Sequence, residues 1–280
     1  AVDFALLKDG KLIELHKEQE TSNFQVGDIF IAKIRKPVAG LNAAFVNVGY
    51  EKDAFLHYQD LGPNLASQLK FIKLVSAGKL KDFSLKNFQF EKEIDKNGSI
   101  TTIINPNQSI LVQVVKEPIS TKGPRICAEL SLAGRFIVLV PFSDRISISQ
   151  KIEDPKEKER LKRLAKSIKP KGFGVILRTV AEGKKVAELD KDLQNSLDRW
   201  KTMCKRIANT NTPTKVLSEL NRASSILRDL MNDSFTNIVT NDETLQVEIK
   251  EYLQEIYPEK EKIVKLHKSA TPIFEKYGIE

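Results

Sequence analysis

Cysteine, histidine and long apolar runs are all scarce in this chain of 280 residues. Cys127 and Cys204 are its only cysteines and stand far apart, so the sequence supports neither a disulfide framework nor a paired-cysteine metal site. Its three histidines, His16, His57 and His267, have no partner at ligand spacing. No apolar run approaches the ~20 residues that a membrane helix requires, and no signal peptide opens the chain. These absences predict a cytoplasmic protein without a membrane partner.

Known nucleotide-binding and nucleophile motifs are absent as well. The chain has no P-loop, no GxGxxG and no GxSxG. Asp190 and Asp192 stand two apart in an expected helix, so we expect them to point away from each other into solvent. Residues 1–280 therefore predict no catalytic residue and no metal ligand in this chain.

The charge balance favours a polyanionic partner only mildly. Forty-five Lys and Arg residues against 37 Asp and Glu residues give a formal net charge of +8 and an isoelectric point near 9.2. Such an excess attracts polyanions at long range, but an ordinary solvated surface explains it equally well.

Residues 26–60 carry the strongest pattern in the sequence. Apolar and polar residues alternate, Phe45 and Phe55 fall on neighbouring strand-like segments, and Lys33, Arg35, Lys36 and Lys52 are interleaved with them. A small β-barrel needs this combination to stack bases and neutralise phosphates, which predicts single-stranded nucleic acid as the partner. The alternative is that both phenylalanines belong to the barrel core.

The remaining segments predict a mixed α and β protein. Residues 1–24 form a hairpin around Asp9-Gly10, and residues 62–108 form an extended, Lys-rich loop or an insertion in the barrel. Strands follow at 110–117 and in ICAELSL, RFIVLVPF and FGVILRTV. Residues 155–171 form a basic helix, and a long helix starts near Lys185 with an apolar stripe that includes Trp200. Residues 216–280 alternate helix, strand and helix, with a cap at Asn241-Asp242.

Arg178-Thr179 ends one of these strands. A planar guanidinium beside a hydroxyl at a strand terminus is a plausible clamp for a terminal phosphate. Because an Arg-Thr pair is common, the signal by itself is weak.

Four segments, read in order, resemble the ribonuclease E/G family. GLNAAFVNVGYEKDAFLHYQDL resembles its S1 domain, TKGPR with LSLAGRFIVLVP resembles the following stretch, GFGVILRTVAEGK resembles its GxGxIxRTA segment, and ATPIFEKYGIE resembles the end of its non-catalytic half. The matches extend over nearly the whole chain.

The resemblance implies roles for particular residues. Phe45 and Phe55 would stack RNA bases in the S1 barrel, with Lys33 and Arg35 beside them, and Lys122 would contact the RNA. For the 5′ end, the resemblance implies a pocket for the 5′-monophosphate of single-stranded RNA, formed by four residues: Gly134, Val138, Arg178 and Thr179.

It also implies a multidomain α+β fold. An S1-type OB-fold barrel (25–125, with an insertion at about 62–108) would be inserted in an RNase H-like subdomain formed by 1–24 and 220–280, with a 5′-sensor domain at 126–219. The 62–108 stretch is longer and richer in lysine than expected, and either contacts RNA or is a solvated loop.

The family's two Mg²⁺-binding aspartates and its paired-cysteine zinc site would lie beyond the end of this chain. The chain begins without Met and ends in foldable sequence, so we expect a fragment of a Mg²⁺-dependent endoribonuclease that acts in RNA processing and decay. The full-length protein would be a homo-oligomer; the fragment would be a monomer that binds RNA and cuts nothing. The alternatives are a non-catalytic S1-domain RNA-binding protein, or a complete nuclease whose active site has no recognisable pattern.

Overall fold

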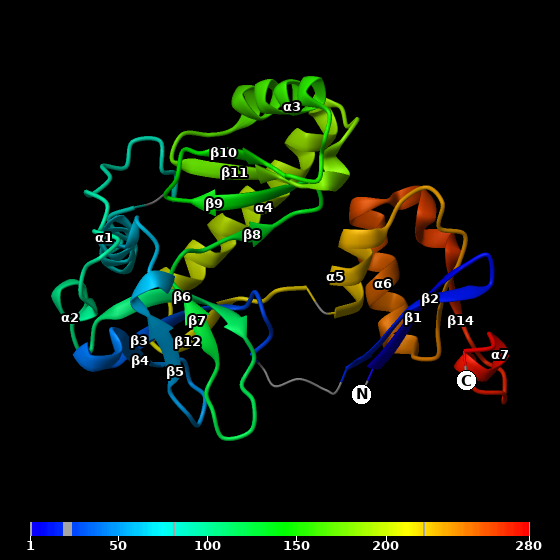
Figure 1. Cartoon of the computed structure of the whole chain (residues 1–280), viewed down its shortest axis with the longest axis horizontal. Coiled ribbons are helices and arrows are strands. Elements are labelled where there is room, and N and C mark those ends of the chain that lie inside the picture. The colour runs from blue at the N-terminus through cyan, green and yellow to red at the C-terminus, as the bar shows by residue number, and fades with distance from the viewer. Residues whose placement is uncertain (1, 19–23, 81, 221, 280) are drawn as a thin grey trace. The chain divides into compact units, whose positions relative to one another are not determined.

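The computed structural model of the chain describes residues 2–18, 24–80, 82–220 and 222–279 and divides into two compact units (Figure 1). Unit 1 comprises Ala1–Thr21 and Leu220–Glu280, and unit 2 comprises Ser22–Glu219. Residues 1 and 19–23 of the expected N-terminal hairpin lie outside the described residues.

Unit 1 pairs an N-terminal hairpin with a C-terminal α/β segment. Its elements are β1 (Val2–Lys8), β2 (Lys11–Glu18), α5 (Arg222–Leu230), β13 (Ile238–Thr240), α6 (Glu243–Ile256), the 3-10 helix η4 (Pro258–Ile263), β14 (Val264–Leu266) and α7 (Ile273–Lys276). The predicted turn is confirmed, because Asp9 and Gly10 both have positive φ between the paired strands. The predicted helix cap is confirmed too, since the Asp242 side chain accepts a hydrogen bond from the Leu245 N–H at the start of α6.

Unit 2 begins with a closed β-barrel. The barrel strands are β3 (Ile29–Val38), β4 (Ala43–Asn47), β5 (Ala54–His57), β6 (Ser109–Lys116) and β7 (Arg125–Cys127). They pair in the order β3-β4-β5-β7-β6, and β6 closes the sheet back onto β3. A closed five-stranded barrel in a mixed α and β protein fits an OB-like fold, as the sequence predicted.

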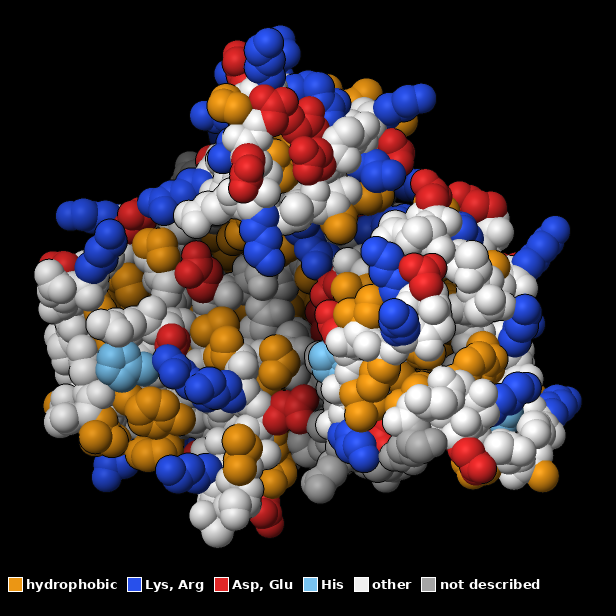
Figure 2. Space-filling model, turned by 45° about the vertical axis from the view of Figure 1, so that its right-hand side comes forward, with side chains coloured by type: hydrophobic (Ala, Val, Ile, Leu, Met, Phe, Trp, Pro, Cys, Tyr) orange, Lys and Arg blue, Asp and Glu red, His pale blue; other side chains and the backbone are white. Residues whose placement is uncertain are grey.

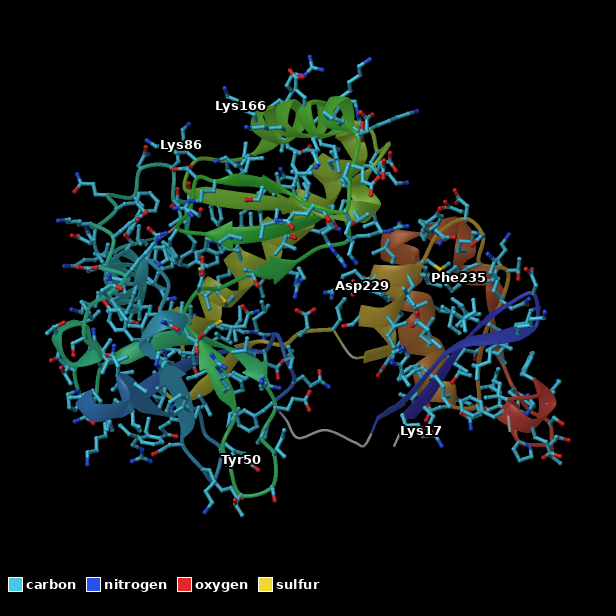
Figure 3. All side chains as sticks on the ribbon, viewed as in Figure 1. Lys17, Tyr50, Lys86, Lys166, Asp229 and Phe235 are labelled. Carbon is cyan, nitrogen blue, oxygen red and sulfur yellow. The ribbon has the colours of Figure 1, made fainter. Side chains whose placement is uncertain are left out.

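A second sheet of unit 2 is covered by helices. Its strands run β10 (Ile146–Ile148), β11 (Phe173–Leu177), β9 (Ile137–Pro141) and β8 (Leu132–Ala133). The predicted helices α3 (Pro155–Ile168) and α4 (Val186–Ala208) pack on it, and the Leu189–Trp200–Ile207 stripe of α4 is buried. Lys166 lies on the outer side of α3 and points into solvent (Figure 3). Short 3-10 helices also belong to unit 2: η1 (Ala39–Leu41), η2 (Tyr58–Asp60) and η3 (Thr179–Ala181).

The first part of strand β3 joins the barrel to the second sheet, because residues 29–32 are buried on both faces of the strand. Phe30 and Ala32 point into the barrel, whereas Ile29 and Ile31 belong to the hydrophobic core that contains α4. Strand β12 (Thr214–Leu217), which follows α4, pairs with β3 on this side. The sequence-based prediction of a helix from residue 216 is therefore wrong at its start, because barrel pairing outweighs the helical pattern of VLSEL.

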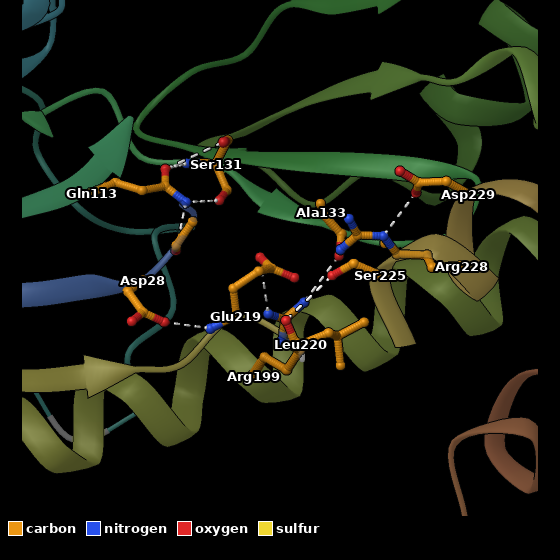
Figure 4. Close-up of polar contacts among 12 residues, drawn as sticks. Asp28, Gln113, Ser131, Ala133, Arg199, Glu219, Leu220, Ser225, Arg228 and Asp229 are labelled. Carbon is orange, nitrogen blue, oxygen red and sulfur yellow. Dashed lines mark hydrogen bonds and ion pairs between the residues drawn. The ribbon is translucent and has the colours of Figure 1, made fainter. Parts of the chain in front are cut away.

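Buried polar contacts hold the same junction (Figure 4). The fully buried carboxylate of Asp28 accepts hydrogen bonds from the Gln25 and Glu219 backbone N–H groups and pairs with the Lys215 Nζ at 2.8 Å. On the neighbouring strand β6, the Gln113 amide bonds the Ser131 backbone in both directions. The first set of contacts ties the start of β3 to β12 and to Glu219 just beyond it, and the second joins barrel strand β6 to the segment that leads to β8.

Residues 62–108 lie between barrel strands β5 and β6, so the structure fits the predicted insertion in the barrel rather than the alternative of an extended loop. This segment carries α1 (Leu65–Ser76) and α2 (Ile100–Ile103). One side of α1 is buried, and Phe71 packs between Phe142 and Trp200, with ring centroids 5.3 Å from each. The buried Ser67 and Gln68 hide the helical apolar period in the sequence, because both are polar residues within the core-facing stripe.

Candidate RNA-binding surface and phosphate pocket

Phe45 of β4 and Phe55 of β5 form a cross-strand pair on the outer surface of the barrel. Their ring centroids lie 6.1 Å apart at an interplanar angle of 68°. Phe45 is 36% exposed, whereas its neighbours Ala44 and Val46 point inward and are fully buried. Alternation along a strand sends successive side chains to opposite faces. The barrel-core alternative for this pair is therefore wrong.

Basic side chains lie on strands and a turn next to the two strands that carry the aromatic pair. Lys33 and Arg35 are exposed on β3, and Lys122 is exposed in the turn before β7. Arg125 lies beside Phe55 in the β5–β7 pairing, and Asp60 holds its guanidinium through two nitrogens at 2.9–3.2 Å. Figure 2 shows hydrophobic side chains next to Lys and Arg side chains over the barrel, at the lower left. The surface offers flat apolar faces next to cations.

Arg178 and Gly134, the other predicted group, meet at the turn between β8 and β9. The Arg178 Nη1 donates to the carbonyls of Gly134 (3.1 Å) and Arg135 (3.3 Å), and its backbone N–H donates to the Phe136 carbonyl (2.8 Å). Val138 follows on β9, where it pairs with Ile176 of β11. The turn thus holds the guanidinium at the end of β11.

Thr179 has a hydroxyl partner that sequence reasoning missed. Its Oγ1 lies 2.9 Å from the Oγ of Ser149, which follows β10. Because a hydroxyl donates once and accepts twice, Ser149 can donate to Thr179 and leave the Thr179 proton directed at a bound anion. The parallel pairing of β10 with β11, 30 residues later, brings the two hydroxyls together.

The loop after Thr179 is held by two carboxylates. Glu157 accepts from the Gly183 N–H and from both Arg160 nitrogens that face it. The Arg160 hydrogen bonds lower the pKa of Glu157 to about 2. At the start of α4, the Lys185 backbone N–H donates to Glu188 and lowers the pKa of that carboxyl. Both carboxylates are therefore ionised at neutral pH and stabilise the loop.

Asp192 corrects a further expectation. Instead of being solvated, its carboxylate accepts backbone hydrogen bonds from Arg135, Phe136 and Ile137, each at 2.9 Å. Only Asp190 behaves as a surface residue, with a contact to Gln194 one turn along α4. No local pattern links Asp192 to a turn more than 50 residues earlier, so sequence reasoning had no signal for it.

Within the described ranges, no three His, Cys, Asp or Glu side chains converge in a way that could hold a metal ion. We therefore assign no described residue to Mg²⁺. In the same part of the chain, no helix combines the length and apolar character needed to cross a membrane.

Comparison with known proteins gives matches along the chain. Residues 131–280 match the family model described as Ribonuclease E/G family. Ribonuclease G of Haemophilus influenzae is 31% identical over 276 residues, which cover 99% of this chain and 52% of that protein. Ribonuclease E of a Nostoc species is 32% identical over 84% of this chain and 30% of its own length.

Ribonuclease G of Escherichia coli is 29% identical over 99% of this chain and 53% of that protein. The chain thus spans about half the length of the ribonuclease G relatives it matches. The family model alone covers more than half of the 280 residues. The resemblance read from the sequence is confirmed, and the chain belongs to the ribonuclease E/G family.

Proposed function

We propose that this chain is the RNA-binding part of an endoribonuclease and grips single-stranded RNA at two places. The pair of exposed Phe45 and half-buried Phe55 on the outer surface of the barrel carries the proposal. It lies on the second and third strands of a closed five-stranded barrel, the face on which OB-folds bind oligonucleotides. Successive bases stack on the two rings while Lys33, Arg35 and Lys122 neutralise phosphates.

The second binding site holds the 5′ end of the RNA. Arg178 offers a guanidinium already oriented by backbone carbonyls, and Thr179 offers a hydroxyl oriented by Ser149. Together they donate charge-assisted hydrogen bonds to a 5′-monophosphate. Gly134 and Val138 line this pocket, and Gly134 cannot carry a side chain, since a Cβ there would lie 2.7 Å from the Ile137 carbonyl oxygen.

Cleavage belongs to residues outside this chain. In the intact protein Mg²⁺ would supply charge stabilisation at the scissile phosphate for attack by water, and none of the described residues of this chain would hold it. The 280-residue chain therefore binds RNA and, with Mg²⁺ added, leaves it uncut, and unit 1, the RNase H-like part, is not catalytic.

The base-stacking proposal is tested with Phe45→Ala and Phe55→Ala. Each variant should lose about 1–3 kcal/mol of binding to a single-stranded RNA oligonucleotide, measured by fluorescence anisotropy. Phe90→Ala is the matched control, because Phe90 is equally exposed at 37% but lies outside the barrel. Unchanged affinity in both barrel variants, with the fold retained, would contradict the proposal.

The 5′-end proposal is tested with Arg178→Ala. Affinity should fall for an RNA with a 5′-monophosphate and change little for the same RNA with a 5′-hydroxyl. Arg145→Ala is the control, since Arg145 is an exposed arginine at the opposite end of the adjacent strand β10. Equal losses for the two RNAs would remove the sensing role.

A further inference from the structure

The turn that holds Arg178 is itself held from its other side by Asp192. Three consecutive peptide units, joining residues 134 to 137, point their N–H groups at this one carboxylate. All three hydrogen bonds measure 2.9 Å. Successive N–H groups that converge in this way form an anion-binding concavity, and here the anion is a side chain of α4.

The opposite side of the same turn faces Arg178. The carbonyls of Gly134 and Arg135 accept from its Nη1, and the Phe136 carbonyl accepts from its backbone N–H. In a trans peptide the N–H and C=O point in opposite directions. A carboxylate that fixes the three N–H groups therefore also fixes the direction of the three carbonyls.

Charge reinforces this geometry. The negative carboxylate lies at the N–H ends of the three peptide dipoles, and the positive guanidinium lies at the carbonyl ends of two of them. Hydrogen bonds to ionised groups are roughly twice as strong as neutral ones. Peptide groups polarised in a chain of hydrogen bonds strengthen one another. Asp192 and Arg178 thus stabilise the same turn from opposite sides.

Gly134 is the position that lets the carboxylate approach. A Cβ built there would lie 2.6 Å from the Asp192 Oδ2, so any side chain would displace it. The contact of the residue 192 carboxylate with this turn therefore requires glycine at residue 134, although the two residues lie far apart in the sequence.

We propose that Asp192 is a positioning residue for the 5′-phosphate pocket, which acts on Arg178 through the three peptide units and touches no RNA. This inference rests on the proposed phosphate-binding role of Arg178. Without the carboxylate the turn loses its fixed orientation, the carbonyls no longer hold the guanidinium, and discrimination between 5′ ends declines.

The test compares Asp192→Ala and Asp192→Asn with Asp190→Ala in the 280-residue chain. Asp190 is the matched control because it lies on the same helix and its side chain bonds a surface glutamine one turn away. The probe is one single-stranded RNA oligonucleotide prepared with a 5′-monophosphate and with a 5′-hydroxyl. The readout is the dissociation constant of the 5′-hydroxyl RNA divided by that of the 5′-monophosphate RNA.

Asp192→Ala should reduce this ratio about tenfold or more, leave 5′-hydroxyl RNA bound within about twofold, and expose the amides of residues 135–137 to hydrogen exchange. Asp192→Asn keeps the shape and one acceptor oxygen, so it should give an intermediate ratio, and it decides the matter if the alanine variant does not fold. Asp190→Ala should match the wild type.

The outcomes separate the two proposals. A wild-type chain with no preference between the two RNAs refutes the phosphate pocket and this inference with it. A wild-type preference that survives in both Asp192 variants refutes the inference alone. Equal losses for both RNAs also refute it, because a general loss of structure would then explain the effect.

Discussion

Replacing Phe71 with alanine tests whether the segment between β5 and β6 is a structural part of unit 2. Phe71 is fully buried in α1, with ring centroids 5.3 Å from Phe142 and Trp200 and 5.8 Å from Phe88. Its ring fills space between the segment that follows β5 and the helix-covered sheet. Removal leaves a cavity that rigid aromatic neighbours cannot fill by small movements.

The expected cost is large compared with the stability of a domain. Truncating a buried phenylalanine to alanine destabilises a protein by about 3–5 kcal/mol, whereas total stabilities are about 5–15 kcal/mol. For a unit of this size each kcal/mol lowers the melting temperature by roughly 2–4 °C. Phe71→Ala should therefore lower it by roughly 6–20 °C.

Urea denaturation followed by tryptophan fluorescence measures this cost directly. Trp200 is the single tryptophan of the chain and is packed against Phe71, so its emission reports on this core alone. Phe90→Ala is the control, because Phe90 is 37% exposed and should cost about 1 kcal/mol or less. If Phe71→Ala costs no more than Phe90→Ala, the segment does not contribute to the core and the packing argument fails.

Three further outcomes follow from the same structure. Because the pKa of Glu157 in the folded chain is lowered to about 2, its pair with Arg160 stabilises the fold above pH ~4.5, and this stabilisation is lost as the pH falls towards 2. In urea denaturation, the difference between the free energies of unfolding at pH 7 and pH 3 should therefore be about 1 kcal/mol smaller in Glu157→Gln than in wild type. Asp28→Ala removes the carboxylate that pairs with Lys215 and accepts from two backbone N–H groups, and should cost about 3–5 kcal/mol in thermal or urea unfolding; a cost below about 1 kcal/mol would contradict this. Burial raises the pKa of the Cys204 thiol, so iodoacetamide should modify Cys204 at about pH 8 only after urea unfolding. Rapid labelling of Cys204 in the folded chain, located by peptide mapping to separate it from Cys127, would be inconsistent with the core.

Regular elements with a clear period were predictable from the sequence. The hairpin at Asp9-Gly10, helix α4 with its apolar stripe and the barrel strands around Phe45 all follow from local turn chemistry and side-chain period. Helix α1 in the 62–108 segment was not predictable, because it buries polar residues and its core partner Trp200 lies more than 100 residues away. Local patterns carry no information about such distant partners.

The candidate sites divide in the same way. The types and order of the residues, Phe45 and Phe55 followed by Gly134 and Arg178, are plain in the sequence and carried the family resemblance. The sequence does not show whether the two rings point into the barrel or out of it, since strand alternation permits both and the barrel register decides.

By itself the sequence determined the family, the barrel with its aromatic and basic strands, and the arginine at the end of β11. The tertiary structure decided which of these side chains are exposed and which groups hold them. Asp192 is the clearest case. In the sequence it is one of three aspartates in a charged helix, and only the approach of α4 to the β8–β9 turn brings three backbone N–H groups to its carboxylate. Its hydrogen bonds depend on the direction of peptide groups, which the fold sets and no residue pattern encodes.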